Sequence, residues 1–99
     1  MTRDEFDSLK EQYNEFMMKV WSKAERYCAE VEGIPSCWLD YIFDISETEI
    51  TFVGSDRHGE HVGMVMPLEI MWDTENVIAR EKARVEQERE AERARYRWP

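Results

Sequence analysis

The residues with the strongest ligand character in this sequence are two histidines that flank a glycine and a glutamate. His58, Glu60 and His61 offer two imidazoles and one carboxylate near a predicted turn, and such groups can bind a divalent metal ion. The two histidines would not share a helix face across this turn, and no third or fourth ligand is indicated. We therefore expect an ordinary exposed turn, in which Gly59 adopts a positive φ angle, and neither a metal ion nor another cofactor.

Groups that could carry out acid-base or nucleophilic catalysis are sparse. Asp40 and Asp44 would share one face of a predicted strand, where a solvated edge is the natural interpretation. Ser55 lacks the flanking glycines of a nucleophile elbow. Neither Cys28 nor Cys37 has a neighbour in the sequence that is recognisable as a general base. The cysteines match no zinc or redox spacing and are expected to be reduced thiols. We therefore predict that the protein is not an enzyme.

The overall charge narrows the classes of partner. The 99 residues include 13 Lys and Arg against 22 Asp and Glu, which gives a formal net charge of -9. Such a charge repels nucleic-acid phosphates and anionic lipids, so neither nucleic acid nor a membrane is expected as a direct partner. No apolar segment has the length of a membrane span, and the N-terminus turns acidic at once, which predicts a cytoplasmic protein.

The negative charge is concentrated in the middle of the chain. Residues 34–72 have Arg57 as their single basic side chain. The same segment contains seven acidic side chains: Asp40, Asp44, Glu47, Glu49, Asp56, Glu60 and Glu69. A basic partner surface would be steered toward this segment, whereas the simpler alternative is a solvated face that keeps a small protein soluble.

A long amphipathic helix is predicted over residues 3–32. Thr2 followed by Glu5 forms a capping box, and Gly33 before Pro35 ends the pattern. Between these signals, apolar side chains recur mostly at three- and four-residue steps: Phe6, Leu9, Tyr13, Phe16, Met17, Val20, Trp21, Ala24, Tyr27, Cys28 and Val31. Such a helix would be about 45 Å long, whereas a compact globule of this chain length is about 32 Å across. The helix must therefore overhang its domain, bend, or meet a partner, and a homodimer through it is one expectation.

The middle of the chain, residues 38–66, predicts a three-stranded antiparallel meander. Three short runs rich in aromatic and β-branched residues are separated by turn sequences too short for a parallel crossover. In the first run, strict alternation would separate two sets of side chains: Tyr41, Phe43 and Ile45 on one face, Ile42 and Asp44 on the other. One face of the sheet is expected to rest on the first helix, and the opposite face is expected to be more polar.

A short helix over residues 67–72 is predicted to follow the meander. Its sequence would turn Leu68, Met71 and Trp72 to one side and close the core. Together with the long helices, this gives an α+β fold in a single domain that covers residues 1–99.

A second long helix is predicted over residues 74–97. It has few sizeable aliphatic side chains, and alternating charge dominates its distal half. Tyr96 and Trp98 stand at its end, where aromatic side chains are typical binding anchors. They could either dock into a groove of a partner or fold back on Tyr13 or Phe16 of the first helix.

Four features follow one another over residues 35–99. They are the entry Pro35-Ser36-Cys37-Trp38, a small meander, the turn Pro67-Leu68-Glu69, and a terminal helix rich in Ala, Arg and Glu. This order resembles a class of small accessory proteins of tailed bacteriophages. Small acidic phage proteins often inhibit host machinery, including CRISPR complexes, by occupying a basic surface. By analogy, the resemblance implies an anti-defence role in the cytoplasm of a host cell.

These observations favour a non-enzymatic phage-type protein that binds and inhibits a host protein. The expected partner is a host protein with a basic surface that normally holds nucleic acid. The contacts are expected to come from the acidic meander and the terminal aromatic pair: Asp44, Glu47, Glu49, Asp56, Arg57, Glu60, Tyr96 and Trp98. Two alternatives stay open: an oligomeric sponge for a small nucleotide signal, and a structural or assembly subunit.

Overall fold

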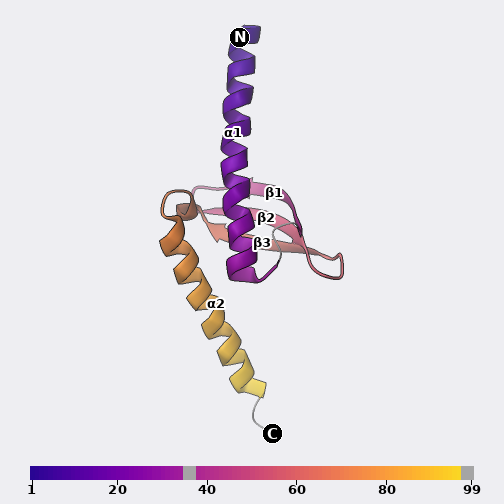
Figure 1. Ribbon diagram of the computed structural model, residues 1–99, viewed down its shortest axis with the longest axis vertical. Coiled ribbons are helices and arrows are strands. Elements are labelled where there is room, and N and C mark those ends of the chain that lie inside the picture. The colour runs from indigo at the N-terminus through magenta and orange to yellow at the C-terminus, as the bar shows by residue number, and fades with distance from the viewer. Residues whose placement is uncertain (35–37, 97–99) are drawn as a thin grey trace.

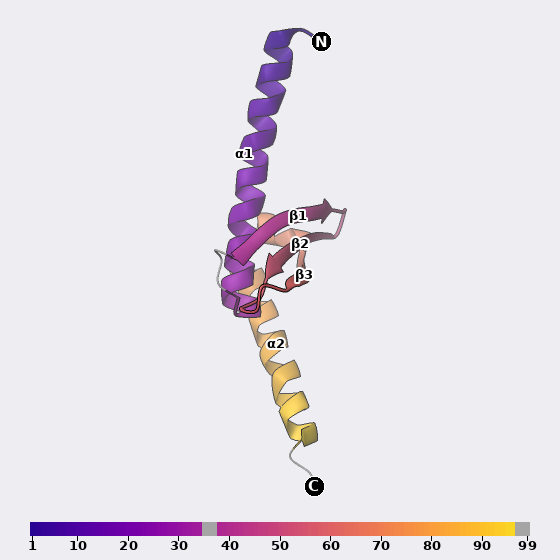
Figure 2. The same cartoon turned by 90° about the vertical axis from the view of Figure 1, so that its right-hand side faces the viewer.

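The computed structural model describes residues 1–34 and 38–96 of the chain. Within these residues, two long helices, a three-stranded antiparallel sheet and short helical turns confirm the predicted α+β class (Figure 1). The sheet and the inner end of each long helix form a folded body, and the outer end of each helix projects from it (Figures 1 and 2). The principal extents are 69 × 30 × 19 Å. The Cα radius of gyration, 16.9 Å, exceeds the roughly 13 Å expected for a compact chain of this length.

Helix α1 spans Arg3–Tyr27 and continues into a π-helical turn, η1, at Cys28–Glu32. The Thr2 hydroxyl accepts a hydrogen bond from the backbone N–H of Glu5 at 3.1 Å, as in the predicted capping box. Gly33 ends the helix with a φ angle of 74°. The predicted helix is therefore confirmed, with its last five residues wound more widely than an α-helix.

The outer part of α1 overhangs the body. Val20 is the first fully buried residue of the chain, and the preceding side chains are exposed apart from the half-buried Met17. We call residues 3–19 the N-terminal arm. Of the three predicted outcomes for this helix, the overhang is therefore the one that the structure shows (Figure 1).

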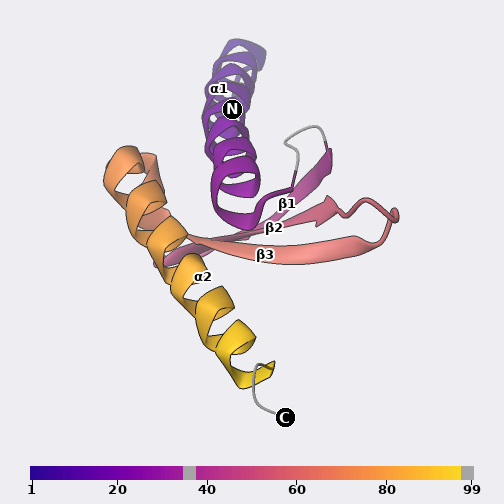
Figure 3. The same ribbon diagram turned by 60° about the horizontal axis from the view of Figure 1, so that its bottom comes forward.

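Helix α2 spans Thr74–Tyr96 and lies beside the inner end of α1 (Figure 3). Val77 and Ile78 are buried in the core, and Val85 is partly buried against it. Every described residue after Val85 is exposed. We call residues 86–96 the C-terminal arm; the predicted end of this helix at residue 97 lies outside the described residues.

Arg26 links α1 to the beginning of α2. Its guanidinium donates hydrogen bonds of 2.6 and 3.2 Å to the two carboxylate oxygens of Glu75, and its Nε donates one of 2.8 Å to Glu30. The bonds from Arg26 hold the pKa of Glu75 below its usual range. Because the pair is solvent-exposed, it orients α2 more than it stabilises the fold.

The sheet is the antiparallel meander that the sequence predicts. Its strands are β1 (Leu39–Ile45), β2 (Glu49–Ser55) and β3 (His61–Pro67), in the order β1-β2-β3. Strands β2 and β3 pair without interruption along their full length. Helix α1 lies across one face of the sheet, and no described helix covers the other face (Figures 2 and 3).

Strand β1 departs from the predicted strict alternation. Two bulges interrupt its pairing with β2, and each adds one residue to β1. As a result, every third residue of the strand faces the core: Leu39, Ile42 and Ile45. Tyr41 and Phe43, which were predicted to share a face with Ile45, are 49% and 69% exposed. That prediction is wrong because the two extra residues shift the register twice.

The core lies between the inner end of α1, the sheet and the first turns of α2. The rings of Tyr27 and Phe52 meet edge to face, with centroids 6.2 Å apart and planes at 89°. The sulfur atoms of Cys28 and Met64 lie 3.8 Å apart. A Cβ atom on Gly54 would lie 2.8 Å from Met64 Cε, so this position requires glycine unless the methionine moves. Further buried members of the core are Val20, Ala24, Val31, Ile50, Met66, Ile70 and Val77.

The short helix after β3 is tighter than predicted. A 3-10 turn, η3, spans Leu68–Met71 in place of the predicted helix over residues 67–72. Both ends of the turn are partly buried against the core, as expected. Ile70 is fully buried, whereas Trp72, a predicted core residue, is exposed. A 3-10 turn advances three residues per turn in place of 3.6, so the helical periodicity used for the prediction does not hold here.

Candidate functional site

The open face of the sheet carries apolar side chains. Two rows of paired residues cross it: Tyr41, Val53 and Gly63, then, nearer the β1–β2 turn, Asp44, Thr51 and Val65. Tyr41 and Val65 remain exposed, and Val53 is half-buried. The prediction of a more polar opposite face is therefore correct only in part, because the bulges turn Tyr41 outward.

Carboxylates border this apolar centre at both ends. Asp44 and Glu49 lie at the end next to the β1–β2 turn, and Asp40 lies at the other end. None of the three strands contains a lysine or an arginine. The negative potential of this face is therefore not compensated within the sheet. We call Asp40, Tyr41, Asp44, Glu49 and Val65 the acidic sheet face.

Ser46 shapes the turn between β1 and β2. Its hydroxyl accepts hydrogen bonds from the backbone N–H groups of Thr48 and Glu49, at 3.3 and 3.0 Å. Its own N–H donates to the carbonyl of Glu49 at 2.8 Å. This turn brings Glu47 next to Asp44 and Glu49, so three of the predicted contact residues are exposed together at one end of the meander.

The turn between β2 and β3 carries three other predicted contact residues, Asp56, Arg57 and Glu60. The Asp56 carboxylate accepts hydrogen bonds from the backbone N–H of Glu60 at 2.9 Å and of His58 at 2.8 Å, which lower the pKa of Asp56. Gly59 has a φ angle of 78°, which confirms the predicted positive value. Strand β2 separates this turn from the first by about 20 Å. The structure therefore divides the predicted acidic set between two ends of the sheet.

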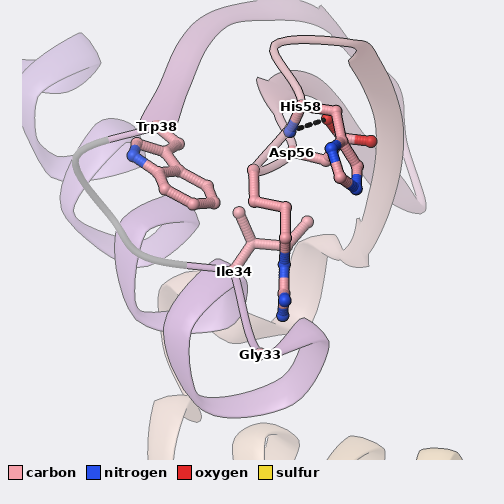
Figure 4. A pocket seen from close by; sticks show the side chains of 6 residues that line it. Gly33, Ile34, Trp38, Asp56 and His58 are labelled. Atoms are coloured by element: carbon pink, nitrogen blue, oxygen red, sulfur yellow. Dashed lines mark hydrogen bonds between the residues drawn. The ribbon is translucent and has the colours of Figure 1, made fainter.

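An open pocket of about 410 Å³ lies beside the β2–β3 turn (Figure 4). Figure 4 shows the Trp38 indole and the turn residues Asp56 and His58 on either side of Ile34. The guanidinium-bearing Arg57 also lines the pocket. The Trp38 indole offers a stacking surface and the Arg57 guanidinium offers donors for an anion, whereas the Asp56 carboxylate in the same lining opposes negative charge. Sequence reasoning missed Trp38 and Ile34 because only the tertiary fold brings them to the turn.

A second side-chain cluster that sequence reasoning missed joins the three strands. The Asp40 carboxylate accepts a hydrogen bond from the Ser55 hydroxyl at 2.7 Å and lies 3.0 Å from His61 Nδ1. These contacts, with Ser55 the larger cause, lower the pKa of Asp40. Nucleophilic catalysis needs the imidazole between serine and carboxylate, but here the carboxylate takes the central place. The cluster therefore orders one edge of the acidic sheet face.

The two histidines of the turn have separate surroundings. His58 lines the pocket, whereas His61 contacts Asp40. Across residues 1–34 and 38–96, no three His, Cys, Asp or Glu side chains gather closely enough to hold a metal ion.

The last predicted contact residues belong to the end of α2. Tyr96 is exposed at the tip of the C-terminal arm, and Trp98 lies outside the described residues. Tyr96 does not fold back on Tyr13 or Phe16, because the two arms leave the body at opposite ends (Figure 1). The outer end of α2, which is Tyr96, therefore projects away from the sheet and its two acidic turns (Figure 1).

Comparison with known proteins found no matching family model, no similar curated protein and no similar solved structure. The resemblance to small phage accessory proteins therefore rests on the sequence features alone. Among the helices in the described part of the chain, none has an apolar stretch of the length that crossing a bilayer requires.

Proposed function

We propose that this protein is a non-enzymatic binding protein whose acidic sheet face binds a basic surface of a partner protein. The composition of that face carries the proposal: exposed Tyr41 and Val65 lie among carboxylates, and the strands contain no lysine or arginine. Tyrosine supplies a large anchor with little loss of conformational freedom, and a charged rim steers the encounter and selects the partner. The Ser55–Asp40–His61 cluster supports a non-enzymatic role because its order does not activate the serine.

Inhibition of a host protein is the specific form of binding that the charge favours. Protein surfaces that hold nucleic acid are rich in lysine and arginine. A chain with a formal net charge of -9 and an acidic sheet face would compete with phosphates for such a surface. A phage-type anti-defence role, including inhibition of a CRISPR complex, fits this chemistry and derives from the sequence resemblance.

Affinity capture from a bacterial extract tests the proposal with matched variants. The face variant, Tyr41→Ala with Asp44→Lys, removes one exposed tyrosine and reverses one carboxylate of the acidic sheet face. The control variant, Tyr96→Ala with Glu92→Lys, likewise removes one exposed tyrosine and reverses one carboxylate, but on the C-terminal arm. We expect the unmodified protein and the control to retain one common partner and the face variant to lose it.

A salt titration of the purified complex then tests the electrostatic part. We expect the affinity to fall at least about tenfold between about 50 mM and about 500 mM salt, because screening weakens attraction between exposed charges. Equal capture by the face variant, or an affinity that does not change with salt, would reject the proposal.

The pocket beside the β2–β3 turn favours a second candidate function, a sponge for a small nucleotide signal. Trp38 could stack on a base while Arg57 meets a phosphate. Calorimetry with a panel of nucleotides tests this candidate. Binding heat that disappears in the Arg57→Ala variant would support it, and the absence of heat for every nucleotide would remove it.

A further inference from the structure

The exposed and buried parts of α1 share one continuous apolar stripe. Its side chains follow one another at steps of three and four residues along one helix face: Phe6, Leu9, Tyr13, Phe16, Val20, Ala24 and Tyr27. From Val20 onward the stripe is buried beneath the sheet. Before Val20, its four side chains are between 47% and 61% exposed. The helix face that builds the core therefore continues, unpaired, along the N-terminal arm.

The uncovered part of the stripe is large for a surface facing water. Residues 3–19 extend for about 25 Å at the usual rise of an α-helix. No described element of the chain lies against this length (Figures 1 and 2). Three aromatic rings and a leucine in line form a contiguous patch of the kind that marks an interaction site.

We propose that the N-terminal arms of two copies of this chain pair antiparallel along this stripe. Alternating steps of three and four residues are the spacing of knobs-into-holes packing. With Leu9 opposite the partner's Tyr13, Phe6 falls opposite the partner's Phe16, and two-fold symmetry repeats both contacts. The N-terminal arm shares no residue with the acidic sheet face, so this inference is independent of the proposed function.

Charged side chains beside the stripe match this register. Glu5, Gln12 and Lys19 follow one border of the stripe at seven-residue intervals. In an antiparallel pair this border lies against the same border of the second arm, which runs in the opposite direction. Glu5 therefore faces the partner's Lys19 at each end. The single like-charge contact, Lys10 with the partner's Lys10, lies on the other border, where both ammonium groups can turn into water.

The position of the sheet argues against a parallel pair. Parallel arms would bring Val20 against the partner's Val20, but each is fully buried beneath its own sheet. In the antiparallel register, Val20 lies opposite the partner's Thr2, which is the N-cap of α1. The second arm therefore fits along the exposed part of the stripe and ends where the folded body of the first chain begins.

The contact area is at the lower bound for a specific interface and suits a weak dimer. The four side chains of each arm offer on the order of 500 Å² of exposed surface, so the pair buries about 1,000 Å². Stable interfaces bury about 1,200–2,000 Å² in total, and the stems of Gln12 and Lys19 supply part of the difference. We therefore expect a dissociation constant in the micromolar range, on the order of 10 µM.

Sedimentation equilibrium from about 1 µM to about 300 µM tests the pair. We expect the mass to rise from one chain to two, and the variants Leu9→Glu and Tyr13→Glu to remain monomeric at every concentration. Both side chains are exposed in the monomer, so these changes leave the body intact. Met18→Glu is the matched control, because Met18 is exposed on the opposite face of the same arm. It should dimerise like the unmodified protein.

Charge reversal tests the orientation. Glu5→Lys alone should weaken the dimer about tenfold or more, because it places two lysines opposite each other. In the antiparallel pair, adding Lys19→Glu restores the affinity to within about threefold. In a parallel pair, Glu5 would face the partner's Lys10, and Lys10→Glu would restore it instead. Circular dichroism of each variant checks that the helix content is unchanged.

Several results would overturn the inference. A chain that stays monomeric up to about 300 µM would contradict the expected affinity. A dimer that survives Leu9→Glu would use another surface. Rescue by Lys10→Glu in place of Lys19→Glu would show that the arms are parallel.

Discussion

The two arms that leave the body differ in what stabilises them as helices. The N-terminal arm carries a stripe of large apolar side chains on one face. The C-terminal arm has no aliphatic side chain larger than alanine, and local ion pairs support its start: Arg84 contacts Glu81 at 2.6 Å and Glu88 at 2.8 Å. Charged pairs at such spacings each contribute a few tenths of a kcal/mol to a solvated helix.

This difference shows that projection from a body does not by itself indicate a binding surface. A helix with charge on every face, such as the C-terminal arm, can remain solvated without a partner. The N-terminal arm leaves a contiguous apolar stripe in water, and covering it is favourable. The kind of side chain along a projecting face therefore decides which arm needs a partner.

The largest expected effect compares phenylalanines in the body and in the N-terminal arm. Phe52→Ala should lower the free energy of unfolding by about 3–5 kcal/mol, because it leaves a cavity beside Tyr27. Phe6→Ala should change it by less than about 0.5 kcal/mol at about 1 µM protein, where the arm is unpaired. Urea unfolding measures both values. A similar loss in the two variants would mean that the arm packs against the body in solution.

A smaller effect on the body is expected at high pH. Burial, with a further contribution from Glu32, raises the pKa of the Cys28 thiol from 9.0 to about 11. The thiol therefore loses its proton at a lower pH in the unfolded chain than in the folded chain. The contribution of the buried, protonated thiol to the free energy of unfolding is complete below about pH 9 and is lost as the pH rises toward 11. The free energy of unfolding should fall by on the order of 2 kcal/mol over this window.

Urea unfolding between pH 8 and pH 11 measures this loss, and Cys28→Ala is the control that should remove it. Burial also raises the pKa of Tyr27, which adds a loss in the same direction that the control retains. If the free energy of unfolding fell equally steeply with pH in the variant and in the unmodified protein, the thiol would be solvated in solution.

Amide hydrogen exchange should separate the two arms by their dependence on concentration. Between about 5 µM and about 300 µM protein, exchange in the N-terminal arm should slow by about fivefold as the dimer forms. Exchange in the C-terminal arm should stay fast and unchanged. If protection from exchange rose with protein concentration equally in both arms, or in neither, the proposed difference between the arms would be wrong.

The smallest effect is expected from a helix break in the C-terminal arm. Ala91→Pro should lower the free energy of unfolding by less than about 0.5 kcal/mol, because every residue of the broken turns is exposed. Ala24→Pro is the matched change at a fully buried position of α1 and should prevent folding. Circular dichroism and urea unfolding distinguish the outcomes. A loss above about 1 kcal/mol for Ala91→Pro would show that the arm is coupled to the core.

Local sequence signals were sufficient for most of the fold. Thr2 and Gly33 mark the ends of the first helix, and the spacing of its apolar side chains identifies the face that packs on the sheet. The bulges of β1 could not be predicted, because Tyr41 and Phe43 are aromatic residues at alternate positions, as on the buried face of a regular strand. The exposure of Trp72 was missed for a similar reason, since a 3-10 turn gives a four-residue segment no distinct pattern.

The candidate site was predictable in its charge but not in its geometry. Apart from the half-buried Asp56, the acidic residues of the two turns are exposed as their composition suggests, and the predicted meander already separates the two turns. The contact of Asp40 with Ser55 and His61 follows from pairing across all three strands, which no single segment reveals. Trp38 reaches the pocket only through the tertiary fold.

The two bulges of β1 also affect how the sheet can grow. A regular, flat edge strand offers a row of free backbone groups on which a foreign chain can assemble, and exposed aromatic rings would strengthen that template. The extra residues break the even spacing of those groups and increase the local twist of the strand. The β1 edge can therefore display Tyr41 and Phe43 while giving amyloid-like stacking no straight ladder to extend.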